Sequence, residues 1–460
     1  MSDKLNICLM NDSFPPLIDG VANAVVNYAN VISNGLGTAT VVTPSHPDAE
    51  DDFPFEVMRY KSIPTEKWCG YRTGYPFSSS RLQKLSNNGF DIIHSHCPFA
   101  STVMARVLRE KTDIPIILTY HTKFDIDIRR ALPTKFLADS AIKLVVANIA
   151  ACDEVWTVSR GAGENLRSLG YEGEYYVMEN GVDFPCGRAD SEDVEELRKL
   201  YGLSEDIPVF LFVGRLLWYK GIRLILDALK KLSEKNIDYR MMIVGDGLDR
   251  EEIEAYTKEI EIDDKVIFTG AVYDREDLRV YYTAGDLFLF PSLYDTNGIV
   301  VREAAACGVP SLLIEGSCAA EGITHGRTGI LTQDNSDAIA AELEFAASHM
   351  DEIHQMGQHA MDEVYLSWES AVKRAYERYM IVADNCRAGQ THRQESVISE
   401  DFFFTMNRMT GAVQKFRSLP HSIRKTGRRF GKKLLRRSSE KEQSSAALPS
   451  EIPTDDYKQE

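Results

Sequence analysis

The segments Asp286–Ser292 (DLFLFPS) and Tyr294–Gly308 (YDTNGIVVREAAACG) decide the fold of this chain. The first is an apolar run that ends at Pro-Ser, and the second begins with a polar turn and continues as an Ala-rich stretch closed by glycine. This order predicts a strand, a loop and a helix. Asp295 then lies in the loop and Glu303 in the helix or at its start. Two carboxylates beside the free N–H groups of a helix N-terminus suit a ligand rich in hydroxyl groups, such as a sugar attached to a nucleotide.

The same alternation of strand and helix continues on both sides of this unit. Leu5–Met10 is a short apolar run, and it precedes a glycine-containing turn and a segment with apolar residues at helical spacing. Further short apolar runs predict the other strands: Ala39–Thr43, Phe55–Tyr60, Asp91–His94, Pro115–Tyr120, Glu154–Ser159, Tyr175–Met178, Val209–Val213, Arg240–Val244, Val266–Thr269 and Ser311–Ile314. This repetition indicates an α/β fold with two Rossmann-like domains that face a cleft.

The length of 460 residues is too great for one ordinary core, so we expect two domains and additional segments. We predict an N-terminal domain over residues 1–183 and a C-terminal domain over 184–364, joined by a linker that contains proline and glycine. The helical segment 365–385 is expected to cross back to the N-terminal domain. Residues 386–460 are polar and are expected to be mostly disordered.

The charge is distributed unevenly along the chain. The net charge of −17 argues against general nucleic-acid binding. Residues 411–439, in contrast, carry ten Lys and Arg and no acidic residue, and apolar residues recur there at helical spacing. This pattern suggests a short interfacial helix that meets a polyanion, although a solvated tail explains it equally well. The first ten residues are too polar for a secretory signal, so we expect a cytoplasmic protein whose eight cysteines are reduced.

Several single residues could contact a nucleotide sugar. Gly20 lies where a strand leads into a helix, so its backbone could approach a phosphate closely, or it could be an ordinary turn residue. Arg215 and Lys220, with Gly214 beside them, could neutralise a diphosphate, or they could be a solvated pair. His121 follows an apolar strand and could contact a ligand at the edge of the sheet, or it could be structural.

Two further motifs argue against other classes of enzyme. Gly245-Asp246-Gly247 is only half of a dinucleotide fingerprint, so a Rossmann dehydrogenase is not expected. Asp125-Ile126-Asp127 is a DxD motif of the kind that can hold a divalent metal on a nucleotide diphosphate. It does not follow a convincing strand, so we expect neither a metal site nor a cofactor.

Taken together, the motifs resemble those of glycosyltransferase family four, whose members are retaining enzymes of the glycosyltransferase-B (GT-B) fold. The resemblance covers roughly residues 5–385. The motifs that carry it in the C-terminal half are FVGRLLWYKGI, IVGDGLDREEI, VIFTGAV, DLFLFPS and EAAACGVP. Those in the N-terminal half are FPPLIDGV, HSHCPF, TYHT, WTVS and ENGVD.

The resemblance implies roles for the matched residues. Asp295 would hold hydroxyl groups of the donor sugar, and Glu303 would hold the ribose. The positions implied in catalysis are His121, Arg215, Lys220 and Asp295, and those implied in donor binding are Gly20, Gly214, Arg215, Lys220, Gly245, Asp295, Asn297, Gly298 and Glu303. Asp295 stands where the family usually has Glu, and Asn297 stands where Phe is common. Because Asp is shorter than Glu, the resemblance does not determine the identity of the donor sugar. The implied mechanism is front-face attack, without a protein nucleophile or a metal.

The segment that follows TYHT is similar to family members that glycosylate diacylglycerol. We therefore predict transfer of a hexose, with UDP-glucose favoured, to a membrane lipid at the inner face of the plasma membrane. The residues expected to contact an anionic membrane surface are Arg129, Arg130, Lys135, Arg424, Lys425, Arg428, Arg429, Phe430, Lys432 and Lys433. Alternative acceptors are a soluble sugar, an inositol phosphate or a polyprenyl-linked saccharide. A non-catalytic nucleotide-sugar-binding scaffold and a metal-dependent transferase are alternatives of other kinds.

Overall fold

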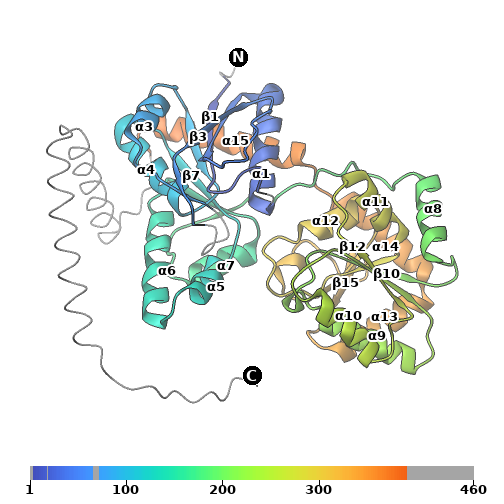
Figure 1. The fold of residues 1–460 in the computed structure, drawn as a ribbon. Helices are drawn as coiled ribbons and strands as arrows, with labels where there is room; N and C mark the ends of the chain where they lie inside the picture. Colours follow the sequence, from blue (N-terminus) through green and yellow to red (C-terminus); the bar gives the residue numbers. More distant parts are fainter. Residues whose placement is uncertain (1–3, 18, 66–71, 391–460) are drawn as a thin grey trace, which may run out of the picture. The chain divides into compact units, whose positions relative to one another are not determined.

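The computed structural model describes residues 4–17, 19–65 and 72–390. Its N-terminal half is built on a seven-stranded sheet in the order β3-β2-β1-β6-β7-β8-β9, in which all neighbouring strands are parallel (Figure 1). The strands are β1 (Asn6–Met10), β2 (Thr38–Pro44), β3 (Glu56–Tyr60), β6 (Ile92–Ser95), β7 (Ile116–Tyr120), β8 (Glu154–Thr157) and β9 (Tyr176–Val177). A short antiparallel pair, β4 (Ser62–Ile63) and β5 (Thr73–Gly74), lies outside this sheet.

Helices follow most strands of this half, as parallel strands require. They are α1 (Gly20–Val31), which continues into a π-helical turn over Ile32–Leu36, α3 (Ser79–Ser86), α4 (Ala100–Thr112), α5 (Phe124–Ala131), α6 (Lys135–Ala150) and α7 (Arg160–Ser168). Helix α1 begins where Asp19 caps it, since the Asp19 carboxylate accepts hydrogen bonds from the backbone N–H groups of Val21 and Ala22.

The C-terminal half has a six-stranded parallel sheet in the order β12-β11-β10-β13-β14-β15. Its strands are β10 (Val209–Val213), β11 (Arg240–Val244), β12 (Val266–Gly270), β13 (Leu287–Leu289), β14 (Ser311–Ile314) and β15 (Gly329–Thr332). This is the 3-2-1-4-5-6 order of a nucleotide-binding doubly wound sheet, in which the chain reverses direction between the first and the fourth strand. Loops that follow β10 and β13 are therefore neighbours.

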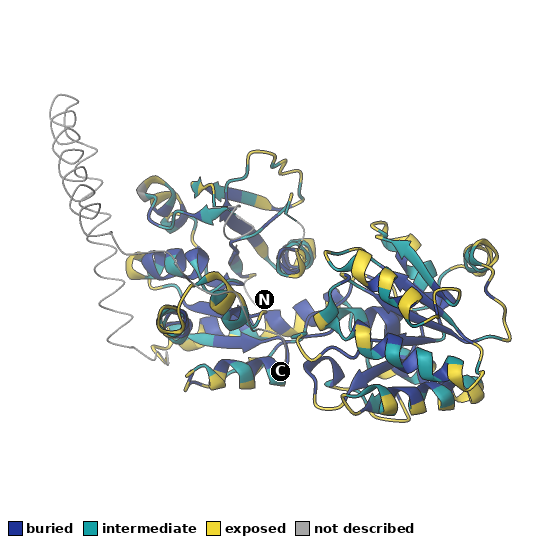
Figure 2. Ribbon diagram, turned by 60° about the horizontal axis from the view of Figure 1, so that its bottom comes forward, coloured by how far each residue is buried: buried dark blue, intermediate teal, exposed yellow. Residues whose placement is uncertain are grey.

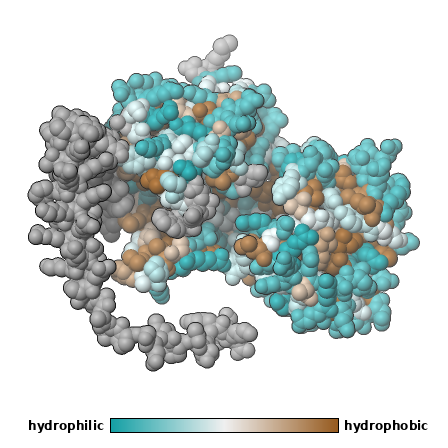
Figure 3. All heavy atoms as spheres, in the orientation of Figure 1, coloured by the Kyte–Doolittle hydropathy of each residue, from teal (hydrophilic) through white to brown (hydrophobic). Residues whose placement is uncertain are grey.

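The helices of the C-terminal half cover this sheet. They are α8 (Ser191–Tyr201), the 3₁₀ turn η2 (Trp218–Lys220), α9 (Ile222–Glu234), α10 (Arg250–Glu259), α11 (Arg275–Ala284), α12 (Ile299–Ala306), η3 (Cys318–Ala320), α13 (Ser336–Ser348) and α14 (Met350–Glu363). The strands are mostly buried except the half-buried edge strand β12, and exposed residues lie on the outer sides of the helices (Figure 2). The visible face is mostly hydrophilic with scattered apolar residues (Figure 3).

The last described helix, α15 (Trp368–Arg387), packs against the N-terminal half, beside α1. The hydroxyl group of Tyr376 accepts a hydrogen bond of 2.8 Å from the backbone N–H of Leu5. The ring of Tyr379 stacks on Trp156 at a centroid distance of 5.2 Å. The crossing helix expected from the sequence is thus present.

The two-domain α/β architecture is confirmed, with differences at particular elements. Strand β13 comprises only Leu287–Leu289 of the predicted run 286–292, because Asp286 accepts a hydrogen bond from the backbone N–H of Val209 through its side chain and Pro291 has no N–H to donate. Strand β15 was not predicted. The predicted basic segment 411–439 lies outside the described residues, and so do its expected membrane contacts Arg424, Lys425, Arg428, Arg429, Phe430, Lys432 and Lys433. Within the described ranges no helix has the length and apolar character needed to cross a membrane.

Candidate active site

The strongest constellation lies where the loops after β10 and β13 meet. Lys220 ends the 3₁₀ turn that follows β10, and Asp295 lies in the loop between β13 and α12. The ammonium Nζ of Lys220 donates a hydrogen bond of 2.6 Å to Oδ2 of Asp295. The chain reversal of the sheet thus brings together two residues that are far apart in sequence, at the edge where such sheets bind ligands.

The environment of Asp295 favours its charged form. Burial by itself would raise the pKa of this carboxyl, but the ammonium of Lys220 and the backbone N–H groups of Asn297 and Gly298 outweigh burial, so the pKa lies below its usual value. Oδ1 accepts a hydrogen bond of 3.1 Å from the N–H of Gly298. The site therefore holds a fixed anion beside a fixed cation at neutral pH.

The loop that carries Asp295 is held by the residues that follow it. Gly298 directly precedes α12 and has a φ of +59°, a left-handed conformation that glycine adopts without strain. Asn297 is buried, and its Oδ1 accepts a hydrogen bond of 3.1 Å from Arg302. Its Nδ2 has no hydrogen-bond partner in the described part of the chain. Arg302 also forms an ion pair of 2.5 Å with Glu179. The amide of Asn297 thus keeps one buried donor that a ligand could satisfy.

Glu303 lies inside α12 and is already hydrogen-bonded. One of its oxygens accepts a bond of 2.9 Å from the hydroxyl group of Tyr282, and the other forms an ion pair of 2.6 Å with Arg275. The same guanidinium of Arg275 bonds Asp183. The sequence reasoning missed Arg275 and Tyr282, both on α11, because no motif or spacing relates them to Glu303.

Gly245, in the loop that follows β11, packs closely against Gly214, in the loop that follows β10. A Cβ at Gly245 would lie 1.9 Å from the carbonyl oxygen of Gly214, and Gly245 has a φ of +145°. The N–H of Leu216 donates to the carbonyl of Asp246 at 3.0 Å, so the two loops run directly against each other. Arg215, by contrast, is exposed and forms no hydrogen bond or ion pair within the described ranges. Its guanidinium is available to an anionic ligand.

His121 lies at the end of β7, next to the loop of Asp295. Its backbone carbonyl accepts a hydrogen bond of 2.7 Å from Oγ1 of Thr296. Its ring is buried, and Nε2 lies 3.0 Å from Nδ1 of His96. Burial lowers the pKa of His121 to about 3, so the imidazole is neutral at physiological pH. Nearby, the ammonium of Lys123 donates to the carbonyl of Leu293 at 3.4 Å.

Gly20 is the first residue of α1, and a Cβ added there would meet no atom within 4 Å. Unlike Gly245, it is not required to be glycine by the packing of the protein. We therefore expect Gly20→Ala to change the free energy of unfolding by no more than about 1 kcal/mol while raising the KM for the donor roughly tenfold. Gly245→Ala, in contrast, should destabilise the fold by about 3 kcal/mol. Thermal unfolding and donor kinetics check both, and an unchanged donor KM in Gly20→Ala would show that no phosphate approaches there.

The other predicted residues lie apart from this constellation. Asp125 and Asp127 of the DxD motif occupy the first turn of α5. Among the residues that the structure describes, no group of three or more His, Cys, Asp and Glu is arranged to hold a metal ion. Arg129, Arg130 and Lys135 are exposed on α5 and α6, where Arg129 pairs with Asp139 at 2.6 Å.

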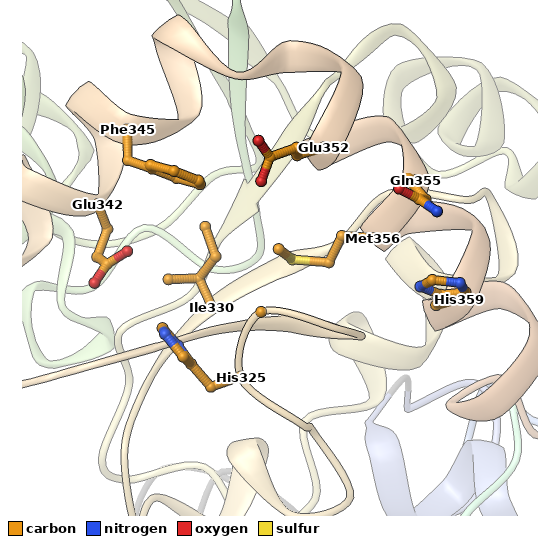
Figure 4. A pocket seen from close by; sticks show the side chains of 9 residues that line it. His325, Ile330, Glu342, Phe345, Glu352, Gln355, Met356 and His359 are labelled. Atoms are coloured by element: carbon orange, nitrogen blue, oxygen red, sulfur yellow. The ribbon is translucent and has the colours of Figure 1, made fainter.

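A cavity of about 350 Å³ lies elsewhere in the C-terminal half, against β15, α13 and α14 (Figure 4). Glu342 and Phe345 of α13 border one side, and Glu352 and Met356 of α14 border the other, with Ile330 of β15 between them. The cavity shares no residue with the Lys220 and Asp295 constellation. We therefore place the candidate active site at the two loops and not in this cavity.

Comparison with known proteins identifies the family of the chain. Residues 193–362 match the family model "Glycosyl transferases group 1", and residues 18–184 match the model "Glycosyltransferase Family 4". The chain belongs to the glycosyltransferases of the GT-B fold and is a hexosyltransferase. The family and fold inferred from the motifs are thus confirmed.

Two curated relatives and one solved structure are similar over most of the chain. The alpha-monoglucosyldiacylglycerol synthase of Streptococcus pneumoniae is 24% identical over 410 residues, which cover 87% of this chain and 91% of the relative. The enzyme of the same name from Acholeplasma laidlawii is 23% identical over 73% of this chain and 86% of the relative. Anabaena HepE in complex with UDP matches 82% of this chain and 100% of its own, with a TM-score of 0.67 at 18% identity.

Proposed function

We propose that the protein transfers a hexose, with UDP-glucose as the favoured donor, to a membrane lipid such as diacylglycerol, with retention of anomeric configuration. The observation that carries this proposal is the similarity to two alpha-monoglucosyldiacylglycerol synthases over most of both chains. The Lys220 and Asp295 pair supports it, because a cation and an acid at the chain reversal suit a diphosphate and a sugar.

The residues of the site have distinct tasks in this reaction. The bond between the anomeric carbon and the diphosphate breaks as the acceptor oxygen bonds to the same face of that carbon, and the acceptor proton passes to the departing phosphate oxygen. Arg215 and Lys220 stabilise the charge that develops on the diphosphate. Asp295 holds hydroxyl groups of the hexose, and Glu303 holds the ribose. No step requires a protein nucleophile or a metal, so activity should survive EDTA.

The α5–α6 hairpin supports action at a membrane surface. Phe136 and Leu137 at the start of α6 have exposed fractions of 79% and 47%. Arg129, Arg130 and Lys135 of the same hairpin are exposed as well. Exposed apolar side chains among cations are the features that draw a protein to an anionic bilayer. We infer a peripheral enzyme at the inner face of the plasma membrane, in which the hairpin and the basic segment 411–439 both contribute to binding.

We expect the double variant Arg130→Gln/Lys135→Gln to bind anionic vesicles roughly 30-fold more weakly, from about 1 kcal/mol per surface cation. The matched control is Lys199→Gln/Lys258→Gln, which removes the same charge from exposed positions of the C-terminal half. Sedimentation with phosphatidylglycerol vesicles at low and high salt measures the effect. Binding that is equal in both double variants would contradict a membrane role of the hairpin.

The acceptor itself is tested by incubating the full chain with UDP-glucose and a lipid extract and identifying glycosylated products by mass. Deletion of residues 411–460 should reduce transfer to lipid in vesicles. Slow release of UDP without any lipid product would favour a soluble acceptor, such as an inositol phosphate or a free sugar. Absence of any donor turnover would leave a nucleotide-sugar-binding scaffold.

A further inference from the structure

Two buried histidines from neighbouring strands meet behind the candidate active site. His96 follows β6 and His121 follows β7, and these strands pair in parallel with Ile93 opposite Ile116. The carboxyl ends of both strands therefore lie at the same edge of the sheet. Nδ1 of His96 lies 3.0 Å from Nε2 of His121, the ring centroids are 5.2 Å apart, and the two ring planes are inclined by 24°.

Both imidazoles are neutral at physiological pH. Burial lowers the pKa of His121 to about 3 and the pKa of His96 well below its usual value, the latter with help from the neighbouring imidazoles. A hydrogen bond between two neutral rings needs one N–H and one lone pair. Either His96 donates from Nδ1 and His121 accepts at Nε2, or His121 donates from Nε2 and His96 accepts at Nδ1.

The other nitrogen of His96 decides between these two arrangements. Nε2 of His96 is buried and has no hydrogen-bond partner among the residues that the structure describes. If His96 accepted at Nδ1, its proton would be on Nε2 as a buried donor without an acceptor, which is the rarer and costlier situation in proteins. If His96 donates from Nδ1, Nε2 carries only a lone pair. The second nitrogen of His121, Nδ1, forms no hydrogen bond within the described ranges and is not among the buried atoms that lack a partner.

We propose that His96 is a positioning residue that holds His121 in the tautomer with its proton on Nδ1, so that His121 presents an N–H donor to an oxygen of the bound donor substrate. The oxygen belongs to a sugar hydroxyl or to a phosphate, and this part of the inference rests on the proposed function. The tautomer of His121 is already set in the protein without substrate, because it depends only on the hydrogen bond with His96.

The surroundings of His96 fix its ring in this orientation. Its backbone N–H donates to the carbonyl of Met10 at 2.8 Å, and the ring of Tyr28 lies edge-on at a centroid distance of 5.2 Å. The centroid of the His94 ring lies 3.9 Å from the centroid of the His96 ring. His94 is itself held, since its ring nitrogens bond the hydroxyl groups of Tyr379, at 2.5 Å, and Thr119, at 2.7 Å. A ring packed in this way cannot exchange its two nitrogens without moving its neighbours.

The tautomer can be read without any substrate. In the full chain labelled with ¹⁵N at its ten histidines, ring-nitrogen chemical shifts distinguish the two neutral tautomers, and His121→Asn identifies the His121 signals. We expect the Nδ1–H form of His121 in the wild-type protein. A wild-type His121 with its proton on Nε2 would overturn the proposal, and a failure of the proposed lipid acceptor would not affect this result.

Two variants at position 96 separate positioning from packing. His96→Phe keeps a ring but removes the donor, so His121 should become a mixture of tautomers. The kcat for donor turnover should then fall about 10–100-fold, the usual loss when the partner that orients a functional imidazole is removed. His96→Asn places an amide nitrogen at the same number of bonds from Cα as Nδ1, so it should restore the Nδ1–H tautomer and most of the rate. Equal losses in both variants, at equal thermal stability, would show that His96 only fills space.

Discussion

Lys220→Ala should lower kcat for hexose transfer by about 10²–10³-fold while the protein remains folded. Lys220 is the cation that the fold fixes at the chain reversal, 2.6 Å from Asp295. A fixed positive charge aimed at a departing diphosphate acts mainly in the transition state, and removal of one such group costs roughly 3–4 kcal/mol of its stabilisation. The loss should therefore appear in kcat and not only in KM.

The fold should tolerate this change because the ion pair is partly exposed, with side-chain exposed fractions of 16% for Lys220 and 21% for Asp295. Loss of the ammonium leaves burial as the main influence on Asp295, so the pKa of that carboxyl should rise. In the wild-type protein the lowered pKa contributes stability above the unfolded pKa, near 3.8, and this contribution disappears as pH falls through the folded pKa. In the Lys220→Ala variant, the free energy of unfolding should lack this contribution of Asp295 to its pH dependence.

Steady-state kinetics with UDP-glucose and the identified acceptor, together with acid unfolding curves, check both expectations. Lys231→Ala is a suitable control, because Lys231 pairs with Asp337 at 2.5 Å on the surface of the same half and lies outside the site. A Lys220→Ala enzyme with wild-type kcat would mean that this cation does not face the diphosphate.

The parts of this site that the sequence could predict are those set by strand order. The first strand, Val209–Val213, was predicted with its observed boundaries, and the fourth, β13 (Leu287–Leu289), lies within the predicted run 286–292. The loops after the first and fourth strands of a doubly wound sheet must be neighbours. The resemblance of the motifs had assigned Lys220 and Asp295 to one donor site, and the strand order explains why such an assignment is possible before any coordinates. Their direct ion pair, in contrast, depends on side-chain rotamers and on the 3₁₀ turn, which no periodicity specifies.

The parts that could not be predicted depend on long-range partners. Glu303 was identified as a ligand-binding acid, yet the sequence contains no signal that Arg275 and Tyr282 would bond it. His96 was visible only as part of the HSHCPF motif, because its bond to His121 requires the register of β6 against β7. The glycines show the same limit: Gly20 and Gly245 look equivalent in sequence, and only the structure shows that Gly245 is needed for packing.

Asp295→Ala should lower kcat/KM for the donor by about 10²–10³-fold, whereas Asp295→Glu should retain most activity and change the preference among donor sugars. In the alanine variant the hydroxyl groups of the hexose lose their acceptor and Lys220 loses its partner, which together remove a few kcal/mol of transition-state stabilisation. In the glutamate variant the carboxylate remains but extends by one methylene, so it can still reach Lys220 while it narrows the space for the sugar.

The neutral variant Asp295→Asn separates charge from size, because it keeps the shape of the side chain and removes only the anion. Its kcat/KM should lie close to that of Asp295→Ala if the charge holds the sugar and Lys220 in place. Competition between UDP-glucose, UDP-galactose and UDP-N-acetylglucosamine measures the change in preference of Asp295→Glu. Because a carboxylate that binds the transferred sugar must respond to its own length, equal losses in the alanine and glutamate variants would mean that Asp295 is not the acid that contacts the hexose, and the ion pair with Lys220 would then be structural.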